Sequence, residues 1–305
     1  MTSPTSKKPD ISLRRGMLVK GKWHGRSYQV IRKLGSGAIG TVYLCQYKNS
    51  YVALKISKQS ASITSEVNVL KSLQVVQGHH LGPSLMDVDD YITANGHRYS
   101  FYIMEYVSGD TLPHFVRQQG KQWLLTLLIS FSKDLEGLHQ QGYVFGDLKL
   151  ENLIVARRPV RLRWVDVGGT TLKGRAIKEY TEFYDRAYWG CGSRKADPGY
   201  DVFALAMVIL RIYYPNGFSR GADPQKTLRK KIDQAVDIEP LQHVLKQMVQ
   251  QTIVDAGQVH TALLSHNRKR RSKKKDKQTD DALHPVIEMV SILTVGAGYC
   301  LFLWL

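Results

Sequence analysis

The chain has 305 residues, 43% of them hydrophobic, so it can bury a full-sized core and does not belong to the disordered class. Its formal net charge of +17 says nothing about the fold but predicts an acidic partner: nucleic acid, an anionic membrane face or acidic substrates. Three scattered cysteines, Cys45, Cys191 and Cys300, exclude a disulfide framework and a zinc set and fit a reducing, cytoplasmic location.

The first part of the chain carries β signals. Residues 1–26 are polar, include seven Lys or Arg and lack the apolar run of a signal peptide, so we expect a basic arm. Apolar residues at helical spacing predict a helix over residues 63–76, and Asn95-Gly96 predicts a hairpin turn. Runs rich in β-branched and aromatic residues predict strands over residues 27–34, 41–47, 51–56, 85–92 and 97–107.

The second part carries helical signals. Gly142 and Pro215 follow the first two apolar-periodic runs at positions where helices commonly end. A β-rich part followed by a helical part predicts an α+β fold with two lobes, over residues 27–107 and 108–264. The apolar periodicity predicts helices over residues 123–141, 201–214, 239–254 and 256–264.

A glycine-rich run matches the pattern G-x-G-x-x-G-x-V with Gly35, Gly37, Gly40 and Val42. A dinucleotide-binding fingerprint needs a helix directly after the glycines, whereas here strand signals lie on both sides. The context favours a glycine flap over nucleotide phosphates, with a flexible glycine turn as the alternative.

Lys55 ends the run Val-Ala-Leu-Lys at the expected distance from the glycines. A lysine in a buried strand is costly unless it is paired, and Glu66, at the start of the next helix, is the expected partner. We therefore expect Lys55 to hold the α- and β-phosphates of a nucleotide. The alternative is a lysine on an edge strand.

The sharpest signal is the run from Phe145 to Ile154, which contains Asp147, Lys149 and Asn152, with Asp166 fourteen residues after Asn152. Phosphoryl transfer requires a carboxylate near the attacking hydroxyl, a lysine on the transferring phosphate and two metal ligands. These four residues supply that set.

With these motifs in order, the sequence resembles the bacterial Hanks-type (eukaryotic-like) Ser/Thr protein kinases. It is most similar to the small, tail-anchored, sporulation-associated kinases of Firmicutes, the YabT type, over roughly residues 27–264 and in the layout of its end. The resemblance implies a two-lobed kinase fold, ATP with Mg²⁺ or Mn²⁺ as cofactors, protein substrates and autophosphorylation.

The resemblance also implies roles for single residues. Asp147 would be the catalytic base that orients the substrate hydroxyl, and Lys149 is placed as in Ser/Thr kinases rather than tyrosine kinases. Asp166 and Asn152 would bind the two metal ions. Asp201 resembles the buried aspartate that opens the large helix of the C-terminal lobe. The hinge would be Met104-Glu105-Tyr106-Val107, and the further ATP-binding residues implied are Val42, Ala53, Glu105 and Val107.

Three departures from the family pattern concern the substrate-docking surface. His-Arg-Asp is replaced by Phe145-Gly146-Asp147, Asp-Phe-Gly by Asp166-Val167-Gly168, and no Ala-Pro-Glu stands at the expected distance before Asp201. They leave two rival hypotheses open: a nucleotide-binding pseudokinase scaffold at the membrane, and a small-molecule or lipid kinase of related fold.

The end of the chain is predicted to form a basic juxtamembrane linker over residues 265–285 and a transmembrane anchor over residues 286–305. Met289–Leu305 is seventeen residues without a charge and would span about 25 Å as a helix. The positive-inside rule then predicts a single-pass protein of the cytoplasmic membrane with its kinase domain in the cytoplasm. The alternative is a buried C-terminal helix of the body.

The centre of the linker is also a candidate polyanion site, with DNA as the first candidate and anionic lipid or a solvated linker as alternatives. A long polyanion would gather several kinases and favour self-association for trans-autophosphorylation. The eight basic residues are Arg268, Lys269, Arg270, Arg271, Lys273, Lys274, Lys275 and Lys277.

Overall fold

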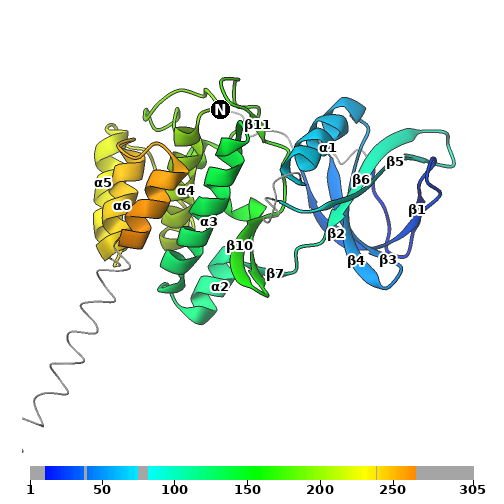
Figure 1. Ribbon diagram of the computed structural model, residues 1–305, viewed down its shortest axis with the longest axis horizontal. Helices are drawn as coiled ribbons and strands as arrows, with labels where there is room; N and C mark the ends of the chain where they lie inside the picture. Colours follow the sequence, from blue (N-terminus) through cyan, green and yellow to red (C-terminus); the bar gives the residue numbers. More distant parts are fainter. Residues whose placement is uncertain (1–10, 38–39, 75–81, 238, 266–305) are drawn as a thin grey trace, which may run out of the picture.

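The computed structural model describes residues 11–37, 40–74, 82–237 and 239–265 of the chain. It has a β-rich N-terminal lobe and a helical C-terminal lobe, which are consecutive in the sequence (Figure 1). This is the α+β, two-lobed architecture predicted from the sequence.

The N-terminal lobe is built on a six-stranded antiparallel sheet of order β1-β2-β3-β4-β6-β5. Helix α1 (Ser60–Gln74) packs against β4, β5 and β6. The strands predicted from the sequence are confirmed, and the hairpin turn is confirmed by the positive φ of Gly96. The strands are β1 (Leu18–Lys20), β2 (Ser27–Ser36), β3 (Thr41–Tyr47), β4 (Ser50–Ser57), β5 (Leu85–Ile92) and β6 (Arg98–Glu105).

Strand β4 lies in the interior of the sheet, between β3 and β6, and its residues from Val52 to Ser57 are buried. Val52 and Leu54 contribute to an apolar cluster within the N-terminal lobe, whereas Ala53 contributes to the cluster that includes α1. Because side chains alternate along a strand, Lys55 lies on the same face as Ala53, toward α1. The alternative of an edge-strand lysine is therefore excluded.

Residues 11–26 belong to the N-terminal lobe, which corrects the expectation of a basic arm over residues 1–26. Val19 of β1 is fully buried, and its strand pairs with β2 along its whole length. A three-residue strand with one buried side chain between two exposed ones gives almost no periodic signal in the sequence.

The loop after β1 is held against β5 at the opposite edge of the sheet. Lys22 N donates a hydrogen bond to Asp90 O at 2.8 Å. A Cβ on residue 21 would lie 2.2 Å from Asp89 Oδ2, so this close approach requires Gly21. The loop thereby covers part of an edge that would otherwise expose unpaired backbone groups.

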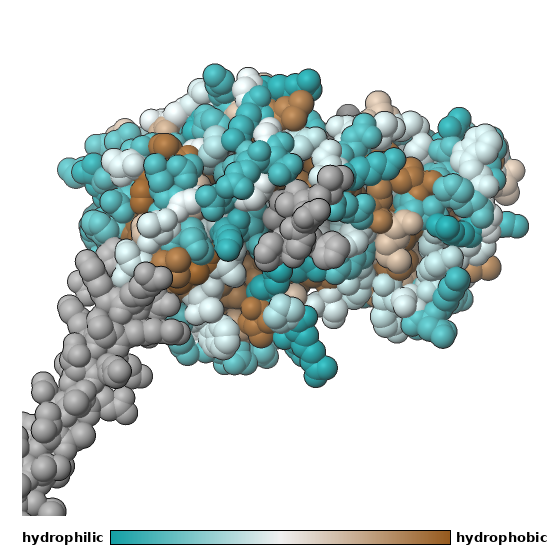
Figure 2. All heavy atoms as spheres, viewed as in Figure 1, coloured by the Kyte–Doolittle hydropathy of each residue, from teal (hydrophilic) through white to brown (hydrophobic). Residues whose placement is uncertain are grey.

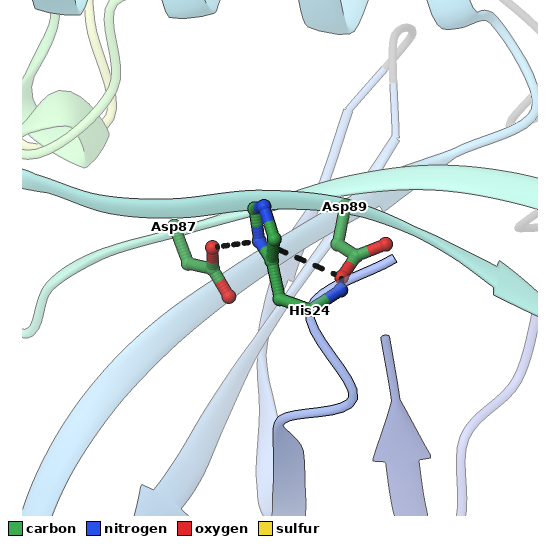
Figure 3. A group of neighbouring side chains, drawn as sticks. All are labelled: His24, Asp87 and Asp89. Carbon is green, nitrogen blue, oxygen red and sulfur yellow. Dashed lines mark hydrogen bonds and ion pairs between the residues drawn. The ribbon is translucent and has the colours of Figure 1, made fainter. Parts of the chain in front are cut away.

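Carboxylates of β5 bind this loop (Figure 3). Asp89 accepts hydrogen bonds from Trp23 N at 2.9 Å and His24 N at 2.8 Å, and Asp87 accepts from His24 Nδ1 at 2.7 Å and the Tyr28 hydroxyl at 2.5 Å. Ligand atoms of His24, Asp87 and Asp89 lie within 4.8 Å of one another, as in a metal site. Each of them is already engaged within the protein, so we assign the cluster, here called the N-terminal latch, to holding the loop.

The C-terminal lobe is organised around α4, in which every residue from Gly199 to Leu210 is buried. Helices α5 and α6 and strand β8 contact α4, whereas α2 and the small sheet of order β10-β9-β7 pack with α3; a second small sheet has the order β11-β8 (Figure 1). The helices are α2 (Leu112–Gln119), α3 (Trp123–Gln140), α4 (Pro198–Tyr213), α5 (Pro224–Ala235), α6 (Glu239–Val249) and a last helix over residues 256–265. The strands are β7 (Gly109–Thr111), β8 (Tyr143–Val144), β9 (Leu153–Arg157), β10 (Val160–Trp164) and β11 (Thr171–Leu172).

The predicted helices of this lobe are present, with one boundary corrected. α6 ends at Val249 rather than at Val254, and Gln251 beyond it has a left-handed φ of 56° that no helix continues through. Helices α2 and α5 were not predicted from the sequence. In α5 only Leu228 and Ile232 of the twelve residues are buried, which leaves little apolar periodicity.

In the ranges of the chain that the structure describes, no helix combines the length and the apolar character needed to cross a membrane. The anchor expected over residues 286–305 and, beyond Ser265, the expected basic linker lie outside the described residues.

Candidate active site

Lys55 is the centre of an ionic cluster that joins the two lobes. Its Nζ lies 2.8 Å from Glu66 Oε2 on α1 and 3.0 Å from Asp166 Oδ1, which follows β10. The hydroxyl of Tyr102 on β6 donates to the same Glu66 oxygen at 2.6 Å. The pair predicted from the sequence, Lys55 with Glu66, is therefore formed, and Asp166 is brought to it from more than a hundred residues away.

The charges of this cluster stabilise one another. Burial would lower the pKa of Lys55, but the carboxylates of Asp166 and Glu66 outweigh burial and raise it. Burial would likewise raise the pKa of Asp166, but the Lys55 ammonium and the N–H of Gly168 outweigh burial and lower it. The pKa of Glu66 is raised by burial, against the effect of Lys55. At neutral pH Lys55 is therefore a buried cation, and Asp166, whose side chain is 36% exposed, is ionised.

Asp147 lies on the loop between β8 and a short 3-10 helix, Leu150–Asn152. Its Oδ2 accepts hydrogen bonds from Lys149 Nζ at 2.6 Å and from Asn152 Nδ2 at 3.0 Å. Asn152 Nδ2 also donates to Asp147 O at 2.9 Å, which fixes the orientation of its amide. Burial raises the pKa of Asp147, while Lys149 and Asn152 oppose that shift. Three of the predicted site residues thus form one hydrogen-bonded group.

Asp201 of α4 holds the start of this loop. It is fully buried and accepts hydrogen bonds from Phe145 N at 2.7 Å, from Gly146 N at 2.8 Å and from His139 Nε2 at 2.9 Å. The buried aspartate was predicted by resemblance, but His139 was not, because a histidine inside a long helix carries no signal of its partner. Three hydrogen bonds to a buried carboxylate tie the loop to the core of the C-terminal lobe.

Two glycines are required by close backbone approaches around Asp147. Gly146 stands where the family has arginine; its φ is 76°, and a Cβ there would lie 2.9 Å from Gly169 O. A Cβ on residue 169 would lie 2.5 Å from the Asp147 Cβ. The departure from His-Arg-Asp therefore allows tight packing of the two loops and removes a cation from the site.

Phe145 and Val167, the two exchanged positions of the motifs, are both buried in the same apolar cluster. Trp164 of β10 lies beside Phe145, with ring centroids 5.6 Å apart. Relative to the family pattern, Phe145 is larger than the histidine that it replaces and Val167 is smaller than the phenylalanine that it replaces. The two changes are compatible because a core tolerates changes that conserve volume.

The glycine-rich run connects β2 and β3. Gly37 N donates to Gly40 O at 2.9 Å, and a Cβ on residue 40 would lie 2.6 Å from Ile56 O, so Gly40 is required where the turn passes beside the backbone of β4. A Cβ at Gly35 or Gly37 would meet nothing within 4 Å. Residues 38–39 lie outside the described residues.

The Glu105 side chain does not face the expected nucleotide site as a free group. Its carboxylate binds Arg163 of β10 at 2.6 Å and accepts a hydrogen bond from Ser84 N at 3.2 Å. This ion pair braces the chain segment that connects the lobes. The resemblance implies that the hinge meets adenine through its backbone, and the ion pair of the Glu105 side chain is compatible with that role.

Apolar residues on either side of the hinge belong to one cluster that spans the lobes. Ala53 and Leu153 are buried in it, and Val42 and Leu34 pack against it. Val107, predicted to bind ATP, is also buried. Leu34 and Leu153 were not predicted as site residues, although Leu34 adjoins the glycine run and Leu153 follows Asn152 directly.

The segment between Val167 and α4 is held by two ion pairs that sequence reasoning missed. Asp185 is fully buried and binds Arg194 Nη2 at 2.7 Å. Arg186 is buried against Asp197, and its Nε donates to Ser193 O at 2.8 Å. Asp197 also caps α4 by accepting from Tyr200 N. These contacts anchor the region in which Ala-Pro-Glu is missing.

Comparison with known proteins places these motifs in a family. The family model for the protein kinase domain matches residues 28–281. Serine/threonine-protein kinase YabT of Bacillus subtilis (strain 168) is 50% identical over 223 residues, which cover 73% of this chain and 66% of that kinase. Protein kinase PINOID 2 of Arabidopsis thaliana is 30% identical over 141 residues, 42% of this chain and 26% of that protein. The matched part of the chain thus spans just under two thirds of the first relative's length and about a quarter of the second's.

Solved structures share the fold at low sequence identity. Vaccinia related kinase 3 aligns with a TM-score of 0.62 and 16% identity, covering 86% of this chain and 93% of that one. The Cydia pomonella granulovirus kinase PK-1 aligns with a TM-score of 0.59 and 20% identity, covering 77% and 94%. At these identities the likeness concerns the two-lobed fold alone.

Proposed function

Because this chain belongs to the protein kinase family, as the resemblance in its sequence predicted, we propose that it transfers phosphate from ATP to Ser or Thr of protein substrates. The observation that carries the proposal is that Lys55 pairs with both Glu66 and Asp166. The three residues come from β4, α1 and the segment after β10, so both lobes are already in the arrangement that phosphate binding needs.

Lys55 is proposed to hold the α- and β-phosphates. Its ammonium is buried, and a charge in such surroundings interacts more strongly with an anion than it would in water. Glu66 and Tyr102 fix its position from one side. Because Gly35 and Gly37 place no side chain in the way, backbone N–H groups of the glycine run could approach the phosphates closely.

Asp166 and Asn152 are proposed to hold Mg²⁺ or Mn²⁺. Both Asn152 amide hydrogen bonds come from its nitrogen, which leaves the side-chain oxygen without a donor among the described residues. Asp166 is ionised and engages Lys55 and Gly168 N through one oxygen only. Hard divalent cations take such oxygen ligands, so the residues fit the metal. When bound, the metal would supply charge neutralisation at the phosphates.

Asp147 is proposed to orient the substrate hydroxyl and to accept its proton. Lys149 and Asn152 hold one of its carboxylate oxygens, and burial raises its pKa toward the range useful to a base. Lys149 would then stabilise the negative charge on the transferring phosphoryl group. Against the pseudokinase alternative, a scaffold would have no need of Lys55, Asp147, Asn152 and Asp166 together.

One labelling experiment separates the three functions. The full chain is incubated with radiolabelled ATP, Mg²⁺, a generic protein and a lipid extract, beside an Asp147→Asn control. Phosphoserine or phosphothreonine in protein, absent with the control, is the expected result. ATP binding without transfer to any acceptor would favour the pseudokinase, and label in small molecules or lipid alone would favour the third alternative.

We further propose that residues 286–305 anchor the protein in the cytoplasmic membrane, with the kinase domain in the cytoplasm. The support is the uncharged run Met289–Leu305 next to a strongly basic segment. Truncation after His284 should move the protein to the soluble fraction with its kinase activity retained. If the truncated protein still pellets with membranes after a high-salt wash, the anchor is contradicted. If the truncated protein unfolds, residues 286–305 belong to the core instead.

We propose that the basic residues of the linker bind a polyanion, DNA first among the candidates. Eight cations in residues 268–277 exceed the two or three that topology requires. Such binding arises mainly from counterion release and falls steeply with salt. The test compares the chain ending at His284 with the same chain carrying Gln at all eight positions. DNA should bind the chain with its basic residues intact and raise its autophosphorylation. Equal DNA affinity of the two proteins would place the site on the kinase body. Binding to anionic vesicles without a response to DNA would favour lipid as the ligand.

A further inference from the structure

Exposed cations gather on the segment that follows the catalytic loop. β11 pairs with β8, and the chain then continues beside residues 194–196, to which it is joined by hydrogen bonds such as Ala196 N to Arg175 O at 2.7 Å. Ala176 and Lys195 face each other as an antiparallel bridge. The group, here called the cationic strip, consists of Lys173, Arg175, Lys178 and Lys195, all exposed.

Lys178 brings the cationic strip close to the surroundings of Asp147. Lys178 Nζ donates to Thr170 O at 2.8 Å, and Thr170 follows Gly169, the residue in closest approach to Asp147. On the other side, Ile177 Cδ1 would lie 3.4 Å from a Cβ on Gly146. Residues directly adjoining Lys178 therefore touch the loop that carries the catalytic aspartate. Figure 2 shows that the upper edge of the helical lobe, where Figure 1 places β11, is mainly hydrophilic.

The positive charge of this segment is not balanced within the protein. Residues 167–197 include six basic and four acidic side chains. Arg194 is paired with Asp185 and Arg186 with Asp197, so these two cations are already used. No member of the cationic strip has an ion pair with a carboxylate among the described residues. Glu179 and Glu182 are the remaining acids of the segment itself, and from outside it the Glu66 carboxylate acts on Lys178.

We infer that the cationic strip is a docking surface for protein substrates, and that it selects Ser or Thr sites flanked by Asp or Glu. The inference rests on the proposed kinase function. An extended substrate advances about 3.3 Å per residue, so acidic residues two to four positions from the acceptor reach about 7–13 Å from it. Complementary charge of this kind sets specificity more than overall affinity, and it is weakened by salt.

The test uses the full chain, treated with phosphatase, and three peptides of equal length with a single Ser flanked by acidic, uncharged or basic residues. The acidic peptide should exceed the uncharged one about tenfold in kcat/KM, as three exposed charge pairs allow. Substitution of Lys173, Arg175 and Lys195 by Gln should bring this ratio to within twofold. The matched control places Gln at Lys133, Lys226 and Lys230, exposed lysines on α3 and α5, and should keep the ratio.

A ratio near one in the unaltered protein, or one that survives in the cationic-strip variant, overturns the inference. Failure of the kinase function itself is separated by binding of fluorescent peptides with Ala at the acceptor position. Salt-sensitive binding of the acidic peptide that the cationic-strip variant loses supports the docking surface even when no peptide is phosphorylated. Loss of duplex DNA binding in that variant with unchanged peptide preference overturns the inference and makes the strip a polyanion site.

Discussion

Gly169 approaches Asp147 so closely that a Cβ on residue 169 would lie 2.5 Å from the Asp147 Cβ, well inside van der Waals contact. Gly169→Ala must therefore displace the proposed base, or the loop that carries it. A shift of about 1 Å in a catalytic group costs roughly a hundredfold in rate. We expect kcat for peptide phosphorylation to fall by at least tenfold, with circular dichroism and ATP affinity little changed.

The control for this prediction is Gly96→Ala. Gly96 has a positive φ, so alanine there is strained and lowers stability, but it lies in the hairpin between β5 and β6, far from Asp147 in the fold. Gly96→Ala should lower the melting temperature and keep kcat. Equal kcat values for the Gly169→Ala and unaltered proteins would show that Asp147 has room to move without loss of function.

Lys55→Ala and Asp166→Ala should each abolish phosphate transfer, but their effects on stability should differ. Lys55→Ala leaves Glu66 buried without its cation, and one Glu66 oxygen already has no hydrogen-bond partner among the described residues. Breaking a buried pair costs about 3–5 kcal/mol. Asp166→Ala should lower the free energy of unfolding much less, because the Asp166 side chain is 36% exposed. Denaturant unfolding of both variants measures the difference, and transfer above a few per cent in either would contradict the site.

Phosphorylation of the segment before α4 should not be required for activity. Gly146 provides no cation to receive a phosphate, and Asp185 and Asp197 already engage the arginines that hold the segment. Thr170 and Thr171 of this segment are buried, whereas Thr181 and Ser193 expose their hydroxyls and are the sites at which we expect phosphate. Phosphatase-treated protein should keep at least half of its initial rate.

The comparison for this prediction is Arg186→Ala. It removes a buried cation from Asp197 and should lower the rate with or without phosphatase treatment. A protein that is inactive after phosphatase treatment, and recovers only in step with autophosphorylation, would show that the segment needs a phosphate despite its ion pairs.

The N-terminal latch should stabilise the fold in a pH-dependent way. Burial would raise the pKa of Asp89, but hydrogen bonds from His24, Trp23 and Asp90 outweigh burial and lower it below its ordinary 3.8. A depressed folded-state pKa contributes stability that is present above about pH 4 and lost as the pH falls through the folded value. Asp89→Asn should cost about 2 kcal/mol at pH 7 and progressively less below pH 4, as urea unfolding at several pH values would measure. Glu182→Gln, an exposed acid, should show no such dependence.

Much of the site could be predicted because its motifs are local in sequence. Lys55, Asp147 and Asn152 stand in short patterns whose order alone indicates phosphoryl transfer, and the structure brings them into the expected contacts. The two-lobed fold followed from the change of period between the β-rich and the helical parts. These features are encoded within windows of ten to twenty residues.

The remaining features depend on contacts between distant residues. Tyr102 with Glu66, His139 with Asp201 and Arg163 with Glu105 are joined over 36 to 62 positions, and no local pattern marks either partner. The prediction of a basic arm was wrong over residues 11–26 for the same reason, because β1 is defined by its pairing with β2 rather than by a local pattern. α5 was missed because its surface is mostly polar.

The N-terminal latch also orders events during synthesis. Its hydrogen bonds join Trp23 and His24 to β5 across more than sixty residues. A ribosome that adds about 5–20 residues per second leaves the loop without its partner for roughly 3–13 s. The residues translated early are thus among the last of the N-terminal lobe to be fixed, and until β5 emerges the loop after β1 is open to chaperones or to other nascent chains.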